Sequence, residues 1–467
     1  MSVARGGMAL IAAQAWHALT GWIIFRTATE VLGDTGYGAF TTVLWTMTTL
    51  EVLVTEGVPR AMALGIAGQP GATRATLRRA LPATFAVALG LCLALALVAP
   101  LLTAAWHAED LTAAVRISGI DFLTFAAFAV FAALANGLRD FKAQARVQFA
   151  YSTAKVLVVI AALIHFRSME GAMLGYVLAS GCGSLCAIFL TRRLPRASSV
   201  EHSALDFRHA WPLGLQSALL ALLINVDLWV SATIAGADDA RFGLYGMAAT
   251  LCHSVYFVLR ALGEALLPAV AHARGQQDAA AVRRATSDGL GLLLILLAMA
   301  LGCGLATSEA LMPLLFGASH HGEAAAFVTW LLPAAAAFTL LSVFAALLSG
   351  AGRTRWALIL LVVVAGANVV ACWCAAGSGS LAAVAEASLA VSLTGVVVGA
   401  LGVRKILGAL VAPRAVVLAV CVGVGDWALL RALALEGWSV VALGGVAGLL
   451  SVAAAAYLLR RSRAAHP

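Results

Sequence analysis

The stretch "RATLRRALPATFAVALGLCLALALVAPLLTAAWHAED" (Arg74–Asp110) decides the fold. Three arginines precede an uncharged apolar run over residues 81–102, and the acidic pair Glu109–Asp110 follows it. A helix that spans a bilayer needs about 20 consecutive apolar residues, and Lys and Arg collect on the cytoplasmic side of a membrane. The stretch is therefore typical of a transmembrane helix that begins in the cytoplasm and ends outside.

The same pattern recurs along the whole chain. Of its 467 residues, 62% are hydrophobic and only 11% are charged, whereas a soluble domain carries roughly 25% charged residues. Basic residues gather in every second loop, which places both termini in the cytoplasm. The spans are expected to be helices, because lipid cannot pair open backbone groups. About fourteen are predicted, over residues 8–25, 38–56, 81–102, 113–135, 149–165, 171–190, 211–235, 242–263, 287–307, 322–349, 355–376, 380–403, 413–433 and 438–459.

The two halves of the chain resemble each other. "GDTGYGAF" (Gly33–Phe40) parallels "DDARFGLY" (Asp238–Tyr245), and "EGVPRAMALGIAGQ" (Glu56–Gln69) parallels "EALLPAVAHARGQ" (Glu264–Gln276). Six spans separate the copies, so both keep one orientation, which indicates two lobes related by an axis along the membrane normal. The predicted division is an N-terminal six-helix lobe, a C-terminal six-helix lobe, and two appended helices with a basic cytoplasmic tail, over residues 1–198, 199–405 and 406–467.

Three stretches carry a family resemblance. They are "FRTATEVLGDTGYGAF" (Phe25–Phe40), "EGVPRAMALGIAG" (Glu56–Gly68) and "NVDLWVSATIAGADDARFGLYGMAA" (Asn225–Ala249). Here the chain resembles the multidrug/oligosaccharidyl-lipid/polysaccharide exporter superfamily, and within it the polysaccharide flippases of the O-antigen and exopolysaccharide type. The resemblance implies two lobes around a central cavity that opens alternately to each side. It also implies a cargo, a polyprenyl-diphosphate-linked oligosaccharide moved from the cytoplasmic to the outer leaflet of a bacterial inner membrane.

Other functions stay open at this point. A cation-coupled small-molecule (multidrug) exporter of the same superfamily and a peptidoglycan lipid-precursor flippase have similar sequences. A membrane enzyme of glycan assembly is disfavoured, because the chain has no large outside loop with charged motifs. A nucleotide-binding loop is missing from the sequence as well. We therefore expect a transporter without a cofactor and without nucleic-acid binding. Its expected partners are the cargo lipid, membrane lipids and glycan polymerase or assembly proteins, with proton or sodium coupling left open.

Charged residues inside the spans are the first site candidates. A charge at the bilayer centre costs roughly 2.5–3.5 kcal/mol on insertion scales and usually faces the protein interior. A diphosphate headgroup needs cations, which Arg26, Lys155 and Arg260 would supply. Each cation also has a simpler interpretation. Arg26 would reach the interface, Lys155 would reach it or pair with a carboxylate, and Arg260 would pair with Glu264 one turn away.

Acidic, amide and glycine residues complete the candidate set. Glu51, Asp121 and Asp227 lie deep in their spans, and Asp227 would form either a salt bridge between lobes or a cation-coupling site. Asn225 would contact sugar hydroxyls or, as we favour, join two helices by a hydrogen bond. The repeated segments Gly33–Phe40 and Asp238–Tyr245 form two corners at the outer face, and their glycines, Gly38 and Gly243, are the gate candidates. The hypothesis is that the two corners meet when the outer side closes. The alternative is that each corner is only a tight turn. The eight cysteines fall within spans and lack histidine partners, so no metal site is predicted.

Overall fold

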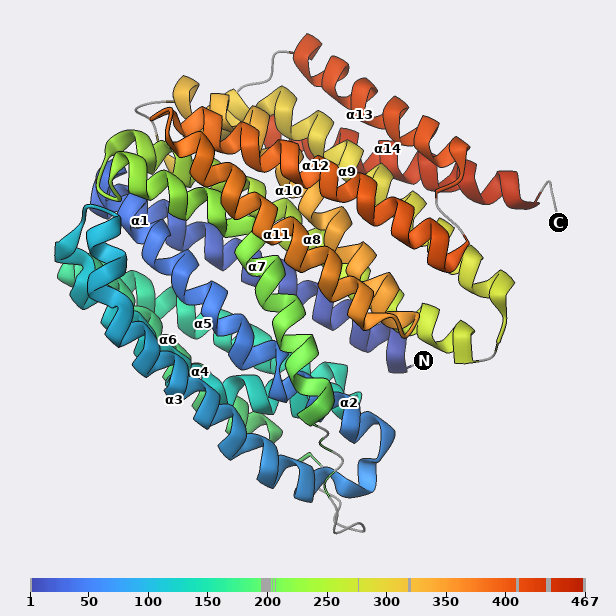
Figure 1. The fold of residues 1–467 in the computed structure, drawn as a ribbon, viewed down its shortest axis with the longest axis horizontal. Coiled ribbons are helices and arrows are strands. Elements are labelled where there is room, and N and C mark those ends of the chain that lie inside the picture. Colours follow the sequence, from blue (N-terminus) through green and yellow to red (C-terminus); the bar gives the residue numbers. More distant parts are fainter. Residues whose placement is uncertain are drawn as a thin grey trace. The chain divides into compact units, whose positions relative to one another are not determined.

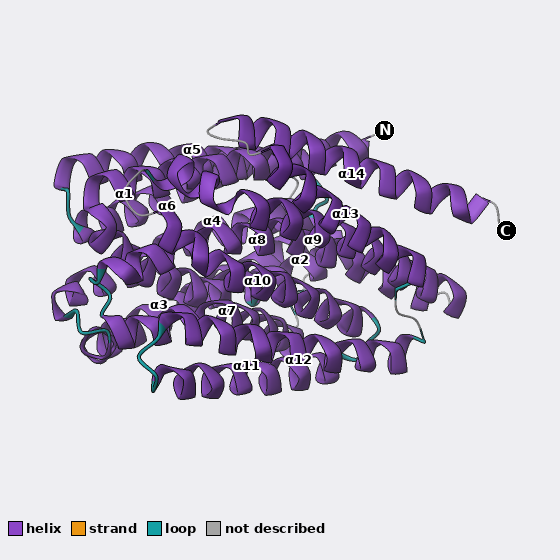
Figure 2. Ribbon diagram, turned by 90° about the horizontal axis from the view of Figure 1, so that it is seen from above, coloured by secondary structure: helices purple, strands orange, loops and turns teal. Residues whose placement is uncertain are grey.

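The computed structural model describes residues 2–194, 203, 205, 207–275, 277–317, 321–408, 411–433 and 438–464. All regular elements in this described part are helices joined by short loops (Figure 2), so the predicted all-α fold class is confirmed. Figure 1 follows them from blue to red. The α-helices are α1 (Ser2–Glu56), α2 (Val58–Gly68), α3 (Thr73–Ala105), α4 (Thr112–Gly137), α5 (Phe141–Phe166), α6 (Met169–Thr191), α7 (Phe207–Ala235), α8 (Ala240–Gly275), α9 (Ala279–Phe316), α10 (His321–Gly350), α11 (Thr354–Ala376), α12 (Leu381–Leu407), α13 (Pro413–Leu433) and α14 (Trp438–Ala464), with short 3-10 turns at Pro70–Ala72 and Glu109–Leu111.

Every predicted span falls on a helix of the structure. Among the described residues, eleven helical stretches are long and apolar enough to cross a membrane, and a shorter apolar stretch covers Ser439–Ala455 of α14. The first two predicted spans lie in α1, which is 55 residues long and bends at Gly33. Gly33 has φ 73° and ψ −179°, a backbone conformation that glycine adopts far more readily than other residues. The bend therefore divides α1 into a first arm (residues 2–32) and a second arm (residues 34–56).

The chain forms two compact units. The first unit contains residues 1–225 and 235–243, and the second unit contains residues 226–234 and 244–467. The boundary passes through α7, and the loop between α7 and α8 packs with the first unit. The predicted division at residues 198 and 405 stays a prediction.

The core of the first unit is built by α1, α4, α5 and α6, with α3 packed on α4. Phe125 and Phe128 of α4 pack against the ring of Tyr151 on α5, at centroid distances of 5.4 and 4.5 Å. Gly183 of α6 faces the same tyrosine ring so closely that an added Cβ would collide with it. Small residues at such contacts let transmembrane helices approach closely, which fixes the spacing between α5 and α6.

In the second unit the two C-terminal helices pack on α9. Gly302 of α9 approaches the backbone of Gly423 on α13 so closely that an added Cβ would collide with the Gly423 carbonyl. Asp426 of α13 is 3% exposed and accepts a 2.6 Å hydrogen bond from the Ser451 hydroxyl of α14. The helices predicted as appended are therefore joined to the second unit by close backbone contact and a buried polar contact.

Candidate functional site

Three of the predicted site residues come together inside the first unit. Glu51 from the second arm of α1, Asp121 from α4 and Lys155 from α5 interact electrostatically with one another. Asp121 is 1% exposed, whereas Glu51 and Lys155 are half-buried. Neither carboxyl forms a direct ion pair with the Lys155 ammonium in the described part of the chain. We call these three residues the acidic cluster.

Aromatic and hydroxyl side chains surround the acidic cluster. The Lys155 Nζ lies 5.0 Å from the centroid of the Tyr176 ring on α6, a cation–π contact. His17 on α1 shares a 2.9 Å hydrogen bond between its Nδ1 and the Ser152 hydroxyl, and its ring stacks on Tyr151. These residues are absent from the sequence-based candidate set, because neutral side chains inside a span give no signal of their own. A spacing of four residues, which puts Tyr151 on the same helix face as Lys155, is the signal that could have revealed one of them.

Asp121 has an incomplete set of hydrogen bonds. The Thr124 hydroxyl donates to the Asp121 backbone carbonyl at 3.1 Å, and Asp121 Oδ1 accepts no hydrogen bond from any described residue. A buried charged oxygen without a partner is costly in a low-dielectric interior. The acidic cluster therefore combines two carboxyls with one ammonium, and its most buried oxygen has a free acceptor position.

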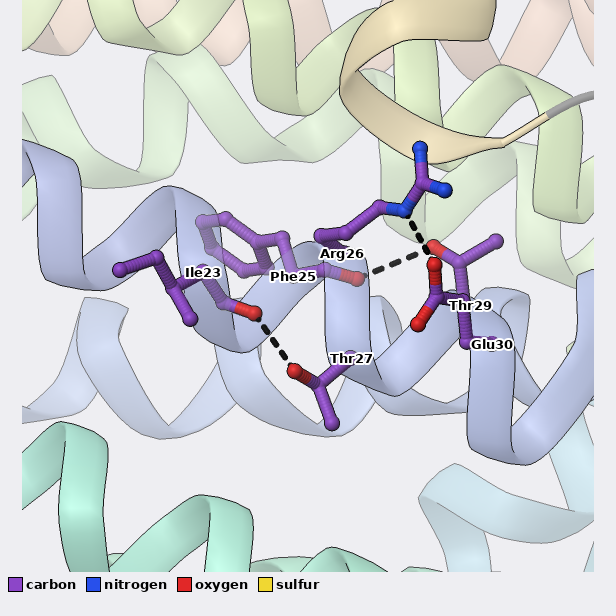
Figure 3. Close-up of polar contacts among 6 residues, drawn as sticks. All are labelled: Ile23, Phe25, Arg26, Thr27, Thr29 and Glu30. Carbon is purple, nitrogen blue, oxygen red and sulfur yellow. Dashed lines mark hydrogen bonds and ion pairs between the residues drawn. The ribbon is translucent and has the colours of Figure 1, made fainter.

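Arg26 lies near the bend of α1 and is paired along its own helix. Its Nε lies 2.5 Å from Oε1 of Glu30, with side chains that are 34% and 56% exposed (Figure 3). In the same close-up the hydroxyls of Thr27 and Thr29 donate to backbone carbonyls one turn earlier. The Arg26 guanidinium is thus half-exposed and paired with a carboxylate one turn along the same helix.

A second buried polar group lies within the second unit. Asp227 of α7 is 2% exposed, and its Oδ2 accepts a 2.6 Å hydrogen bond from the Tyr245 hydroxyl of α8. Cys372 of α11 interacts with Asp227 and contacts the Asn368 side-chain oxygen and the Val384 carbonyl at 3.7 and 3.9 Å. We call Asp227, Tyr245, Asn368, Cys372 and Val384 the Asp227 cluster. Tyr245 and the α11 residues are further polar groups that the sequence alone did not single out.

Two predicted residues have more limited descriptions. The backbone of Arg260 lies in α8, but its side chain and that of Glu264 are outside the described residues, so their pairing and the headgroup role of Arg260 stay predictions. Asn225 donates to the Thr49 hydroxyl at 3.0 Å and to the Ala221 carbonyl at 2.9 Å. The first of these bonds joins α7 to α1 and is the interhelical hydrogen bond that the sequence favoured for Asn225. A role of Asn225 in sugar binding stays a prediction.

The two repeated glycine corners are in backbone contact within the first unit. An added Cβ on Gly38 would lie 2.8 Å from the Ala237 carbonyl oxygen and 3.1 Å from the Gly243 nitrogen, and one on Gly243 would collide with the Asp34 carbonyl. The Ala237 N–H also donates to the Trp106 carbonyl at 3.0 Å. We call this contact between residues 34–38 and 235–243 the corner contact. Whether it acts as a gate is a separate question, and the gate stays a prediction.

Fold and site together define a class of protein. The apolar helical stretches and the family models that match the chain place it in the multidrug/oligosaccharidyl-lipid/polysaccharide exporter superfamily, whose members are transporters and not enzymes. The chain belongs to the family described as polysaccharide biosynthesis protein, whose model matches residues 3–273, more than half of the chain. The MatE family model also matches residues 212–374. The recognition made from the sequence is thereby confirmed.

Solved structures with the same fold include a flippase and several transporters. The lipid II flippase MurJ, in an inward closed conformation, has a TM-score of 0.72 at 11% identity and covers 97% of this chain and 99% of its own. An inward-facing multidrug resistance MATE family transporter has a TM-score of 0.63 at 13% identity, covering 84% and 95%. A superfamily transporter from Pyrococcus furiosus has a TM-score of 0.57 at 12% identity, covering 87% and 96%. No curated protein shows significant similarity to the chain.

Proposed function

We propose that the chain is a flippase that moves a polyprenyl-diphosphate-linked oligosaccharide from the cytoplasmic to the outer leaflet by alternating access. The observation that carries the proposal is the match of residues 3–273 to the polysaccharide biosynthesis family. Half-exposed Arg26 and half-buried Lys155 would bind the diphosphate, because guanidinium and ammonium groups are the usual phosphate ligands. The hydroxyl, amide and carboxyl groups around them would bind sugar hydroxyls.

Coverage of the structural relatives favours a lipid cargo over a drug. The likeness to the lipid II flippase extends over 97% of this chain, whereas that to the MATE transporter extends over 84%. Multidrug export remains the second candidate, since the MatE model matches residues 212–374, and a peptidoglycan precursor is the alternative lipid cargo.

The remaining expectations fit the same mechanism. Asp227 is a candidate for proton or sodium coupling, because a buried carboxyl in a transporter span marks an ion pathway by default. The gate would be the corner contact, which closes the outer side in one state. We place the protein in a bacterial inner membrane with both termini in the cytoplasm, on the basis of the basic loops. Glycan polymerase or assembly proteins would be its functional partners.

A flipping assay with three substrates tests the proposal. The purified chain is reconstituted into vesicles that contain a fluorescent polyprenyl-diphosphate oligosaccharide, and access of an impermeant quencher to the inner-leaflet label is measured over time. We expect protein-dependent quenching of this lipid. Matched vesicles contain a fluorescent peptidoglycan precursor or a fluorescent cationic drug. Transport of only the precursor or only the drug would refute the proposal and support the corresponding alternative.

A further inference from the structure

The start of α5 and the end of α6 carry a strongly basic surface in the first unit. Five exposed cations make it up, and we call them the basic end: Arg139, Lys142, Arg146, Arg192 and Arg193. None of the five forms an ion pair with a carboxylate in the described part of the chain. The acid beside them, Asp140, caps α5 by accepting a 2.9 Å hydrogen bond from the Ala143 N–H. The positive charge of the basic end therefore exceeds the negative charge that the described residues place beside it.

The packing of α5 on α6 brings the two parts of the basic end together. The Tyr151 ring of α5 lies against Gly183 of α6, and a Cβ added to Gly175 would lie 3.0 Å from the Val159 Cα. Eight residues forward along α5 thus correspond to eight residues back along α6, so the helices are antiparallel with a constant register. The same register, continued nine residues from Tyr151 towards the start of α5, places the first turn of α5 level with the last turn of α6.

This register sets Lys142 of α5 level with Arg192 of α6. Packed helices lie about 8–10 Å apart, so two long side chains at one level can both reach a single anion. Arg146 belongs to the same group, because its Nε donates to the Lys142 backbone carbonyl at 3.4 Å. Three cations from two helices are therefore placed to bind one phosphate group, through the charge-assisted hydrogen bonds that such groups form.

An exposed apolar stripe continues from the basic end along each helix. Its members recur after one or two helical turns, and they are Phe149, Leu157 and Ile164 on α5 and Leu178, Leu185 and Phe189 on α6. The Arg192 guanidinium carbon lies 3.8 Å from the centroid of the Phe189 ring, so charge and stripe join directly. On α5 the Phe149 ring stacks on Trp16 of α1 at 5.2 Å. Both helices are long and apolar enough to cross a membrane, so the stripes are available to lipid chains.

We propose that the basic end binds the headgroup of an anionic phospholipid whose acyl chains lie along the two apolar stripes. The order of groups along the helices matches the order in such a lipid, with charge at the end and hydrocarbon beyond it. Guanidinium and ammonium groups are complementary in charge to a phosphate, and basic pockets between membrane helices recognise anionic headgroups. A soluble acidic partner would leave the stripes uncovered. A zwitterionic lipid carries its own cation and would gain less from the basic end.

The bound lipid would stabilise the packing of α5 on α6. Lys142 and Arg192 are like charges at the same level of neighbouring helices, so they repel each other when no anion is present. A phosphate between them replaces this repulsion by two attractions. The site is thus a place for a resident membrane lipid, and it is separate from the cargo and from the proposed flipping activity.

Native mass spectrometry of the full chain tests the site without cargo or transport. The chain is released from neutral detergent that contains equal amounts of phosphatidylglycerol and phosphatidylcholine, and the Kd of each lipid is measured by titration. We expect one phosphatidylglycerol to bind in preference to phosphatidylcholine. Removing three cations should raise its Kd about 100-fold. The site variant combines Lys142→Gln, Arg146→Gln and Arg192→Gln.

A matched control removes the same charge elsewhere. It combines Arg74→Gln, Arg78→Gln and Arg79→Gln, three exposed arginines on the single helix α3, and should leave the Kd unchanged. If the site variant fails to fold, Arg192→Gln alone should still raise the Kd about fivefold.

Four results would overturn the proposal. Equal binding of the two lipids would show that the headgroup is not recognised, and an unchanged Kd in the folded site variant would show that these cations do not bind it. An equal loss in the control would mean that only the overall charge matters. Displacement of the lipid by glycerol 1-phosphate at the same concentration would indicate a plain anion site, to which the apolar stripes contribute nothing.

Discussion

The corner contact gives a prediction with a calculable size. In Gly243→Ala the new methyl group would overlap the Asp34 carbonyl, and backbone cannot move aside as a flexible side chain would. Overpacking of this kind costs about 1–3 kcal/mol. If the corner contact opens and closes during transport, that cost falls on the closed state alone. At 1.4 kcal/mol per tenfold change, the open population would rise roughly 5- to 150-fold.

Labelling of a buried position measures that population. Ala237 is 0% exposed and its carbonyl touches Gly38, so a cysteine at residue 237 in a background lacking the eight native cysteines is protected while the contact is closed. We expect an impermeant maleimide to label it faster in Gly243→Ala by the factor above. Gly21→Ala is the control, since nothing lies within 4 Å of its added Cβ. Equal labelling rates in the two variants would refute the gate and leave the corner contact as a fixed turn.

Three further substitutions have defined expectations. Tyr245→Phe removes the donor to buried Asp227, which should lower the free energy of unfolding by about 1–3 kcal/mol; an unchanged thermal midpoint would mean that the hydrogen bond contributes nothing. Gly302→Ala should destabilise the packing of α13 on α9 by about 1–3 kcal/mol, seen as a lower midpoint than in Gly425→Ala, where the added methyl meets open space. The triple variant in which Arg26, Lys155 and Arg260 are all changed to alanine should keep its expression level and lose flipping. Normal glycan export by this variant would exclude an anion site made by these three cations.

The fold was predictable because the bilayer restricts the alternatives. Long uncharged runs such as residues 81–102 must be helical in lipid, and each predicted span indeed lies on a helix. Hydropathy did not predict that the first two spans lie in one helix, α1. This continuity depends on Gly33, whose positive φ lets two helical arms follow each other with a bend and no loop.

The site was predictable only as far as charge reveals it. Glu51, Asp121 and Lys155 attracted notice because ionisable groups are rare in spans, and the structure brings them together. The phenols of Tyr176 and Tyr245 were not among the predicted site residues because neutral side chains do not stand out in an apolar span. Pattern analysis also could not show that most of α7 packs with the first unit. That packing depends on specific contacts, such as the approach of Gly214 to Gly57.

The second arm of α1 links the two features of the first unit for which we propose roles. It carries Gly38 of the corner contact near its start and Glu51 of the acidic cluster thirteen residues later, a separation of about 20 Å along a helix. The same arm holds Glu51 in the acidic cluster and Gly38 against residues 235–243. The two arms meet at Gly33, where an added Cβ would meet no atom within 4 Å. Any movement of the second arm during transport would therefore change the acidic cluster and the corner contact together.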